Sequence, residues 1–207
     1  MVSLQWPDAD RFNPALKTLL LSRETETHRN PVTSMDIEPG LYESKFELFS
    51  WTDPPVLALR QFCWDALYSV IGSLNRYSID ALRQIDIRSH TWFHITRRGG
   101  QFGNHNHPMA SWSGVYCVAP GRHDADRPNS GVLRFINPLA MAQMFRDPAN
   151  QQLMEPFQHG NLSMRLDAGQ LVLFPSWLFH EVAQFHGSDE RITIAFNCWF
   201  ERRRSDQ

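Results

Sequence analysis

Residues 85–95 read IDIRSHTWFHI, a stretch in which apolar or β-branched residues alternate with polar ones. A period of two is typical of a β-strand, because successive side chains of a strand point to opposite faces of the sheet. The sequence therefore predicts a strand with one largely apolar face, formed by Ile85, Ile87, Ser89, Thr91, Phe93 and Ile95. The opposite face is polar and carries Asp86, Arg88, His90 and His94.

Short strand-like runs continue from this strand to residue 200, and glycine-containing turns separate them. With the run that ends at Arg97 there are eight predicted strands, and the other seven span residues 101–106, 112–119, 131–136, 161–166, 170–175, 180–185 and 191–200. Many short strands of this kind predict a barrel or jelly roll.

A helix is predicted ahead of the strands. Asp53-Pro54-Pro55 is typical of a helix start, with an acidic N-cap and proline in the first turn. Apolar residues then recur at spacings of three and four as far as Leu74, which indicates one buried face. We expect a mostly β fold with a leading helix in a single domain, 1–207, in which 1–80 form an N-terminal arm and supporting helix and 82–200 the β core.

Other segments carry weaker signals. Residues 1–40 contain four prolines and are predicted to be a loosely structured arm with a short strand or helix and no chemistry. We expect a strand around 41–49, a charged loop at 121–130 and a short helix at 139–145.

Composition excludes several classes of function. A formal net charge of −2 gives no reason to expect nucleic acid or a membrane surface as partner. No apolar run approaches the roughly 20 residues of a membrane-spanning helix, and no signal peptide is evident, so a cytoplasmic setting is expected. The three cysteines have no CxxC spacing and are interpreted as buried apolar side chains: Cys63, Cys117 and Cys198.

Three histidines form the strongest candidate for a metal site. His105 and His107 lie two positions apart, so on a strand both imidazoles project to the same side and can reach one ion. His180 closes the apolar run 174–180 and adds a third imidazole. Such a set can bind Fe(II), zinc, nickel or copper. His90 and His94 either line a cavity or are hydrogen-bonded residues of the barrel.

Arg191 adds a separate constraint, because it opens the apolar run 192–196 and a buried guanidinium needs a partner. Its planar fork suits a carboxylate held by two hydrogen bonds, and the Thr193 hydroxyl lies on the same side of the strand. The alternative is a salt bridge to a neighbouring acid, Asp189, Glu190 or Glu181.

These residues resemble a family of small bacterial 2-oxoglutarate- and Fe(II)-dependent oxygenases, which carries an H-x-H-P…S-G-V-Y-Y-V segment and a later F-P-S-W-L-x-H-x-V segment. The corresponding stretches here are residues 105–108, 113–118 and 174–182, and 191–197 also fits. The resemblance covers roughly residues 90–200. It implies a cupin-like double-stranded β-helix, a jelly roll, with His105, His107 and His180 as iron ligands.

The resemblance also implies a dioxygenase that hydroxylates an unactivated C–H bond of a small molecule or peptide side chain and releases succinate and CO2. Arg191, with Thr193 near it, would hold the far carboxylate of 2-oxoglutarate. Further candidates for hydrogen bonds around the metal or cosubstrate are Asn104, Asn106, Tyr116 and Asn197.

Two positions depart from the usual pattern. His107 stands where the wider superfamily has a carboxylate ligand, and the smaller family has histidine there. An occupied position argues against the halogenases of the superfamily, which vacate it for chloride. Cys117 stands where the family usually has a second tyrosine.

Two other functions remain open from the sequence. One is a three-histidine metal dioxygenase that does not use 2-oxoglutarate, in which Arg191 would hold a carboxylate of the substrate. The other is a non-catalytic cupin-like protein that binds a small acid or a partner protein. Zinc or nickel with hydrolytic or isomerase chemistry ranks last, because no glutamate stands in a general-base position. The aromatic-rich N-terminal half is compatible with a homodimer.

Overall fold

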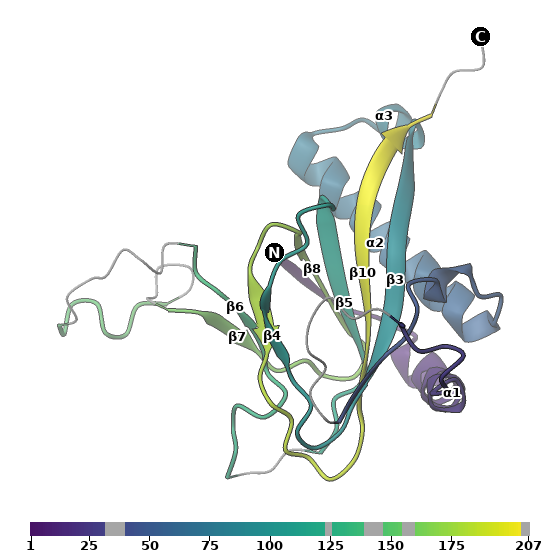
Figure 1. Cartoon of the computed structure of the whole chain (residues 1–207). Helices are drawn as coiled ribbons and strands as arrows, with labels where there is room; N and C mark the ends of the chain where they lie inside the picture. Colours follow the sequence, from purple (N-terminus) through teal and green to yellow (C-terminus); the bar gives the residue numbers. More distant parts are fainter. Residues whose placement is uncertain (32–39, 123–125, 139–146, 155–159, 204–207) are drawn as a thin grey trace.

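The computed structural model describes residues 1–31, 40–122, 126–138, 147–154 and 160–203. Two antiparallel β-sheets face each other, and the helices lie on the outer side of the larger one (Figure 1). The predicted short helix at 139–145 lies outside the described residues.

The larger sheet joins segments from both ends of the chain. Its strands are, in spatial order, β1 (Val2–Gln5), β8 (Gln170–Pro175), β5 (Trp112–Ala119), β10 (Arg191–Arg202), β3 (Ile85–Thr96) and β2 (Leu41–Glu43). β10 and β3 pair over their full twelve residues, from Arg191 opposite Thr96 to Arg202 opposite Ile85. The long central pair fixes which side chains of the two strands stand side by side.

The smaller sheet has four short strands in the order β4 (Phe102–His105), β9 (His180–Val182), β6 (Leu133–Phe135) and β7 (Leu162–Met164). Apolar side chains of β6 and β8 meet between the sheets in a second, smaller core made by Cys117, Leu133, Phe135, Leu166, Val172 and Phe174. This core holds the two sheets together next to the cavity described below.

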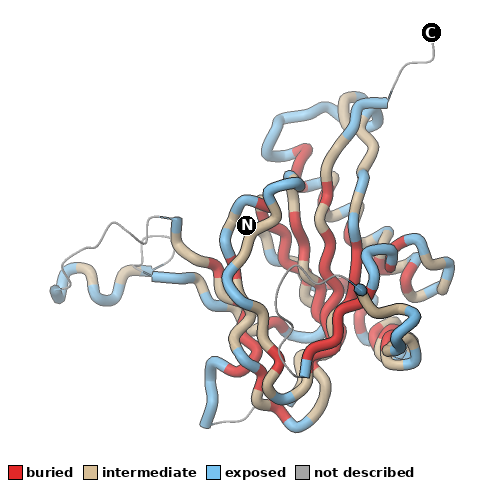
Figure 2. Tube along the Cα trace, in the orientation of Figure 1, coloured by how far each residue is buried: buried red, intermediate tan, exposed pale blue. Residues whose placement is uncertain are grey.

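Helices cover the outer face of the larger sheet. They are α1 (Ala9–Ser22), α2 (Pro54–Asn75) and the short α3 (Ile79–Arg83), with a 3-10 turn at Leu48–Ser50. α2 begins directly after Asp53, with proline in its first turn, as predicted. Its buried residues belong to the main core together with apolar side chains of β3, β5, β8 and β10, and the buried stretches of these strands stand out in Figure 2.

The interpretation of residues 1–40 as a loosely structured arm was wrong for most of its described part. β1 forms the edge of the larger sheet beside β8, and α1 is a 14-residue helix that contains Pro14. Trp6, between the two elements, is buried and stacks on Phe12 and Phe62. Prolines misled the prediction because Pro14 lies within the helix and its missing N–H does not prevent tertiary packing of the rest.

The other strand predictions agree more closely with the structure. All eight predicted strands are present, although the ones in the smaller sheet are shorter than expected. The predicted strand around 41–49 is a strand only at Leu41–Glu43 and continues into a 3-10 turn. All three cysteines are buried and free. None of the helices in the described part of the chain is long and apolar enough to cross a membrane.

Candidate metal centre

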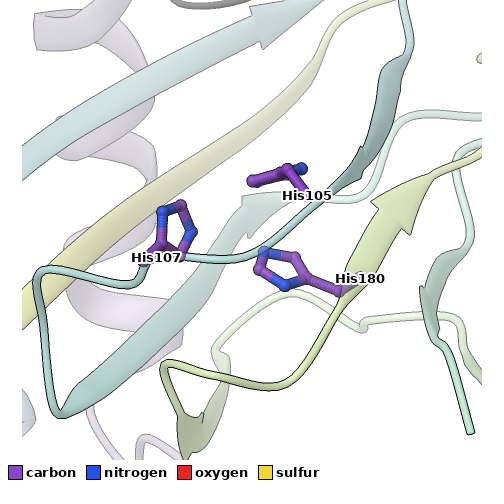
Figure 3. A group of neighbouring side chains, drawn as sticks. All are labelled: His105, His107 and His180. Atoms are coloured by element: carbon purple, nitrogen blue, oxygen red, sulfur yellow. The ribbon is translucent and has the colours of Figure 1, made fainter. Parts of the chain in front are cut away.

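His105, His107 and His180 converge on one point between the two sheets. His105 ends β4 and His180 begins β9, and the two residues stand opposite each other in the pairing of these strands. The backbone N–H of His107 donates to the Ser176 carbonyl at 2.9 Å, which ties the loop after β4 to the segment before His180. The three rings face a common space in Figure 3, with centroids 4.3 to 5.1 Å apart.

Backbone carbonyls orient two of the imidazoles. The Nδ1 of His105 lies 2.8 Å from the Gly103 carbonyl, and that of His180 lies 2.9 Å from the Leu178 carbonyl. Because a carbonyl oxygen only accepts, Nδ1 carries the proton and Nε2 of a neutral ring keeps its lone pair for a metal. One nitrogen from each of the three histidines lies within 4.8 Å of the others.

The surroundings keep all three rings neutral. Burial lowers the pKa of His107 to about 3 and that of His180 to about 4, and the neighbouring imidazoles act in the same direction. Burial also lowers the pKa of His105. Metal–nitrogen bonds are about 2.1 Å long, so two ligands of one ion lie at most about 4.2 Å apart, which is close to the spacing of these nitrogens. The donor set therefore fits Fe(II) or another divalent transition metal.

A cavity of about 400 Å³ extends from the histidines between the two sheets. Side chains of β3, β5 and β10 form one wall, and side chains of β4, β6 and β9 form the other. Along β10 the residues that line it are, in order, Arg191, Thr193, Ala195, Phe196 and Asn197. Ala195 stands opposite Trp92, whose ring lies 6.2 Å from that of His107, so the metal centre is level with the middle of this series.

Arg191 lies at one end of the cavity with its charge buried. The residue is 5% exposed, and its side chain forms no ion pair or hydrogen bond with any of the described residues. The three acids of the salt-bridge alternative have other partners: Asp189 accepts from the Arg122 N–H, Glu190 pairs with Arg97, and Glu181 pairs with Arg134. Burial of the guanidinium lowers its pKa. A buried, unpaired cation is costly, which indicates an anionic ligand at this end.

The backbone beside Arg191 leaves room for its side chain. Gly131 has a φ of +66°, and a Cβ at this position would lie 3.1 Å from Cδ of Arg191. A side chain there would be strained and would press on the arginine. The glycine before β6 therefore contributes to the shape of this end.

Thr193 and Asn197 line the cavity at different levels. Thr193 is 2% exposed, and its hydroxyl has no hydrogen-bond partner in the part of the chain that the structure describes. Asn197 is six residues from Arg191, roughly 20 Å along a strand, and its Oδ1 accepts from the Ser113 hydroxyl at 2.7 Å. Thr193 thus lies two residues from Arg191 along β10, whereas Asn197 lies beyond the level of Ala195.

Tyr116 does not lie in the cavity, in contrast to its predicted role beside the cosubstrate. Its side chain points to the helix side of β5 and belongs to the main core, where its hydroxyl donates to Asn13 of α1 at 2.7 Å. The next residue, Cys117, points between the sheets and acts electrostatically on Arg191. The alternation of the strand therefore places the cysteine, and not the tyrosine, on the side of the ligand end.

Asn104 and Asn106 also separate. Asn104 is exposed in β4, whereas Asn106 lines the cavity and its amide donates to the Trp177 carbonyl at 3.3 Å. His90 and His94 both line the cavity, as one of the two interpretations of these residues predicted.

Glu43 is a residue of the cavity that the sequence analysis missed. It ends β2, is 9% exposed, and places Oε1 2.8 Å from Nδ2 of Asn30 and Oε2 3.0 Å from Nε2 of His94. The same His94 nitrogen lies 3.0 Å from Nε1 of Trp92. If Nε2 carries the proton, it can donate to Glu43 but cannot accept from Trp92. An ionised carboxylate gains more from a donor than the indole N–H gains from an acceptor, so we assign the hydrogen bond to Glu43. The only sequence signal was an acid in a short apolar strand.

Solved structures with the same fold include three that align over nearly the whole chain. A prolyl-4-hydroxylase from Pseudomonas putida is 18% identical, with a TM-score of 0.59 over 99% of this chain and 92% of that chain. A Trichoplax adhaerens prolyl hydroxylase, in complex with a hypoxia inducible factor peptide fragment, is 13% identical, with a TM-score of 0.59 over 96% and 82%. HygX from Streptomyces hygroscopicus, with nickel, 2-oxoglutarate and hygromycin B bound, is 12% identical, with a TM-score of 0.56 over 95% and 82%.

These similarities confirm the predicted double-stranded β-helix. No protein of curated function matches the sequence. Residues 90–197, which are 108 of the 207 residues, match the family described as "Putative 2OG-Fe(II) oxygenase". Enzymes of this family use non-haem Fe(II) and 2-oxoglutarate as cofactors. The match includes all three converging histidines and Arg191, and the chain belongs to the 2OG-Fe(II) oxygenase family.

Proposed function

We propose that the protein holds Fe(II) through His105, His107 and His180 and 2-oxoglutarate through Arg191 and Thr193, and that it hydroxylates an unactivated C–H bond of a small molecule or peptide side chain. The observation that carries the proposal is the buried guanidinium of Arg191, which has no partner among the described residues and shares a cavity with three neutral imidazoles. The cavity thus offers a cationic site for a carboxylate and a nitrogen ligand set in one enclosed space.

Distances along β10 are compatible with one ligand between the two sites. Arg191 is four residues from Ala195, the level of the metal centre, which corresponds to roughly 13 Å along a strand. A five-carbon dicarboxylate whose keto acid end binds the metal would cover about half of this distance, and the long arginine side chain would cover the rest. The guanidinium fork would receive that carboxylate in two hydrogen bonds, and the Thr193 hydroxyl would donate a third.

Apolar side chains limit the access of water to the cavity. Val115 of β5, Leu133 of β6 and Val182 of β9 line it, and Thr96 of β3 stands opposite Arg191. When Fe(II) and 2-oxoglutarate are bound, they supply the oxidation by O2 that converts a C–H bond to C–OH and releases succinate and CO2. The protein's part is to orient the cosubstrate and to keep solvent away from the reacting groups.

The other side of the metal centre would receive the primary substrate. Phe46, His90 and Asn197 line the cavity there, whereas Glu43 stands opposite His94 at the level of Thr193. Similar folds are seen in prolyl hydroxylases, one in complex with a peptide fragment, and in HygX with hygromycin B bound. Both peptide side chains and small molecules therefore stay within the proposal.

The test is anaerobic addition of 2-oxoglutarate to the Fe(II)-loaded protein. Chelation of iron by the keto acid is expected to give a visible charge-transfer band, and Arg191→Ala should raise the 2-oxoglutarate concentration needed for half of this band at least tenfold. Arg97→Ala is the matched control, because Arg97 pairs with Glu24 outside the cavity. No band at saturating 2-oxoglutarate would contradict the proposal.

A second candidate function follows from His107, since a third neutral imidazole in place of a carboxylate is also the ligand set of dioxygenases that need no cosubstrate. In that case Arg191 would hold a carboxylate of the substrate itself. Loss of metal in His105→Ala and His180→Ala, without a 2-oxoglutarate band in the unchanged protein, would favour this candidate. Unchanged metal content in both variants would favour a binding protein without catalysis.

A further inference from the structure

We propose that Glu43 supplies, from outside the ligand set, the negative charge that the third imidazole leaves missing at the metal centre, and that it thereby raises the affinity of the site for divalent metals. Glu43 is a positioning residue in this proposal, because it acts on the metal through space and through His94. The inference rests on the proposed metal site and goes beyond it, since the family resemblance assigns no role to this residue.

The position of Glu43 is fixed from two sides. Its Oε1 accepts from the Asn30 amide at 2.8 Å, and Nε2 of His94 lies 3.0 Å from its Oε2. In the sheet Glu43 stands directly opposite His94, so backbone pairing holds the two residues side by side. The carboxylate is thus held in place by Asn30 and a histidine, and neither an arginine nor a lysine among the described residues pairs with it.

Electrostatic interactions connect Glu43 with the metal ligands. His105 favours the ionised form of Glu43, and Glu43 favours the protonated forms of His105 and His107. Side-chain contacts join the same groups: the Phe102 ring lies 4.4 Å from that of His94 and 6.0 Å from that of His105. A positive charge between His105 and His107 would therefore lie within the field of the carboxylate.

Charge balance in the cavity gives the reason for an acid at this position. Glu43 is the only carboxylate among the described residues that line the cavity, and Arg191 is the only arginine. With neutral imidazoles these two charges cancel. A divalent metal and dianionic 2-oxoglutarate then add +2 and −2, so the loaded site is neutral. Without Glu43 the loaded site would carry +1, a costly excess in a space shielded from water.

A carboxylate ligand at position 107 would give the same balance. Glu43 thus supplies, from a longer distance, the negative charge that a carboxylate ligand would supply. Burial raises the pKa of Glu43, but the hydrogen bonds and charges of its neighbours lower it below its usual value, so the carboxylate is ionised in the ligand-free protein. A bound metal would add a positive charge within the field of this carboxylate.

The experiment compares Mn²⁺ affinities, with the free ion followed by electron paramagnetic resonance. Glu43→Gln removes the charge and keeps the shape of the side chain and the acceptor oxygen for Asn30, while an amide nitrogen replaces the oxygen that faces His94. We expect it to bind Mn²⁺ roughly tenfold more weakly, the lower end of what substitutions around metal ligands cost. Glu24→Gln is the matched control, because it removes a carboxylate outside the cavity, and it should change the affinity less than twofold.

A rescue separates charge from structure. His107→Asp places a carboxylate in the ligand set, so in the Glu43→Gln background it should restore most of the lost Mn²⁺ affinity. In the unchanged background the same substitution adds a second negative charge and should gain clearly less. Circular dichroism and the melting temperature of the metal-free proteins show whether each variant is folded.

The outcomes of this experiment are distinct from those that test the metal site. If the unchanged protein binds Mn²⁺ through its histidines and folded Glu43→Gln binds it equally well, the role of Glu43 is refuted and the metal site stands. Equal losses in Glu43→Gln and Glu24→Gln, or no rescue by His107→Asp, refute it as well. If the unchanged protein binds no metal, or His180→Ala binds it equally well, the metal site itself fails.

Discussion

The two faces of the larger sheet contact different partners, although the same strands form both. On the helix side, Phe93 and Ile194 are fully buried and pack in the main core. On the cavity side, their neighbours His94 and Thr193 line an enclosed space with polar groups. The buried side chains of the first face pack in the main core, whereas Arg191 and Thr193 on the second lack partners among the described residues. Stability and binding are thus carried by alternate residues of one strand, and neighbouring substitutions should separate them.

The largest expected effect is on the helix side. Phe93→Ala removes a fully buried ring and should lower the free energy of unfolding by about 3–5 kcal/mol, because the sheet and helices cannot close the cavity left behind. Denaturant unfolding measures this loss. The Mn²⁺ affinity of the folded fraction should stay within twofold, and a tenfold loss would mean that the two faces are not independent. Ile95→Val, at about 0.5–1.5 kcal/mol, serves as a milder variant.

His180→Ala tests the cavity side at the metal. Binding of zinc by four ligands is worth about 10–16 kcal/mol, so the loss of one ligand should cost about 3 kcal/mol, or roughly 100-fold in metal affinity. Metal analysis after dialysis measures the effect, and the melting temperature of the metal-free protein should hardly change. His186→Ala is the control, since His186 lies outside the cavity. Full metal content in His180→Ala would contradict the predicted ligand set.

Arg191→Met should change stability and 2-oxoglutarate binding in opposite directions. In the ligand-free protein it replaces a buried cation, which has no partner in the described part of the chain, by an apolar side chain of similar length, so we expect a gain of about 1–3 kcal/mol in stability. The rise in melting temperature that 2-oxoglutarate causes in the metal-loaded protein should disappear at the same time. A destabilised ligand-free variant would indicate that Arg191 has a structural partner.

Thr193→Val should have the smallest effect. The substitution keeps the shape of the side chain and removes a buried hydroxyl without a partner among the described residues, so stability should change by less than about 1 kcal/mol. The affinity for 2-oxoglutarate should fall by about 1 kcal/mol, or roughly fivefold, as one hydrogen bond is lost. Titration of the charge-transfer band measures it. An unchanged midpoint would leave Arg191 as the sole side-chain anchor.

The sequence predicted the parts of the fold that depend on local periodicity. Alternation in 85–95 gave the two faces of β3, and spacings of three and four gave α2. The prediction for residues 1–40 failed although the buried residues of α1 recur at the same spacings: Ala9, Asn13, Leu16 and Leu20. Pro14 lies among them and was taken as a sign of irregular structure. Alternation shows which residues share a face of a strand, but not whether that face packs on the helices or on the second sheet. For this reason Tyr116 was predicted to lie beside the cosubstrate, although it packs on the helix side.

What the sequence determined by itself is the set of chemical groups in this site: two imidazoles on one strand end, a third that closes an apolar run, and an arginine at the start of another strand. Local spacing suffices to keep His105 and His107 close together, although His107 lies in the loop after β4 and not on the strand. The tertiary structure alone decided what surrounds them. It left Arg191 without a partner among the described residues, turned Tyr116 away, and brought Glu43 beside His94. Those relations depend on strand pairing between segments far apart in the chain, and single-chain periodicity carries no information about such pairing.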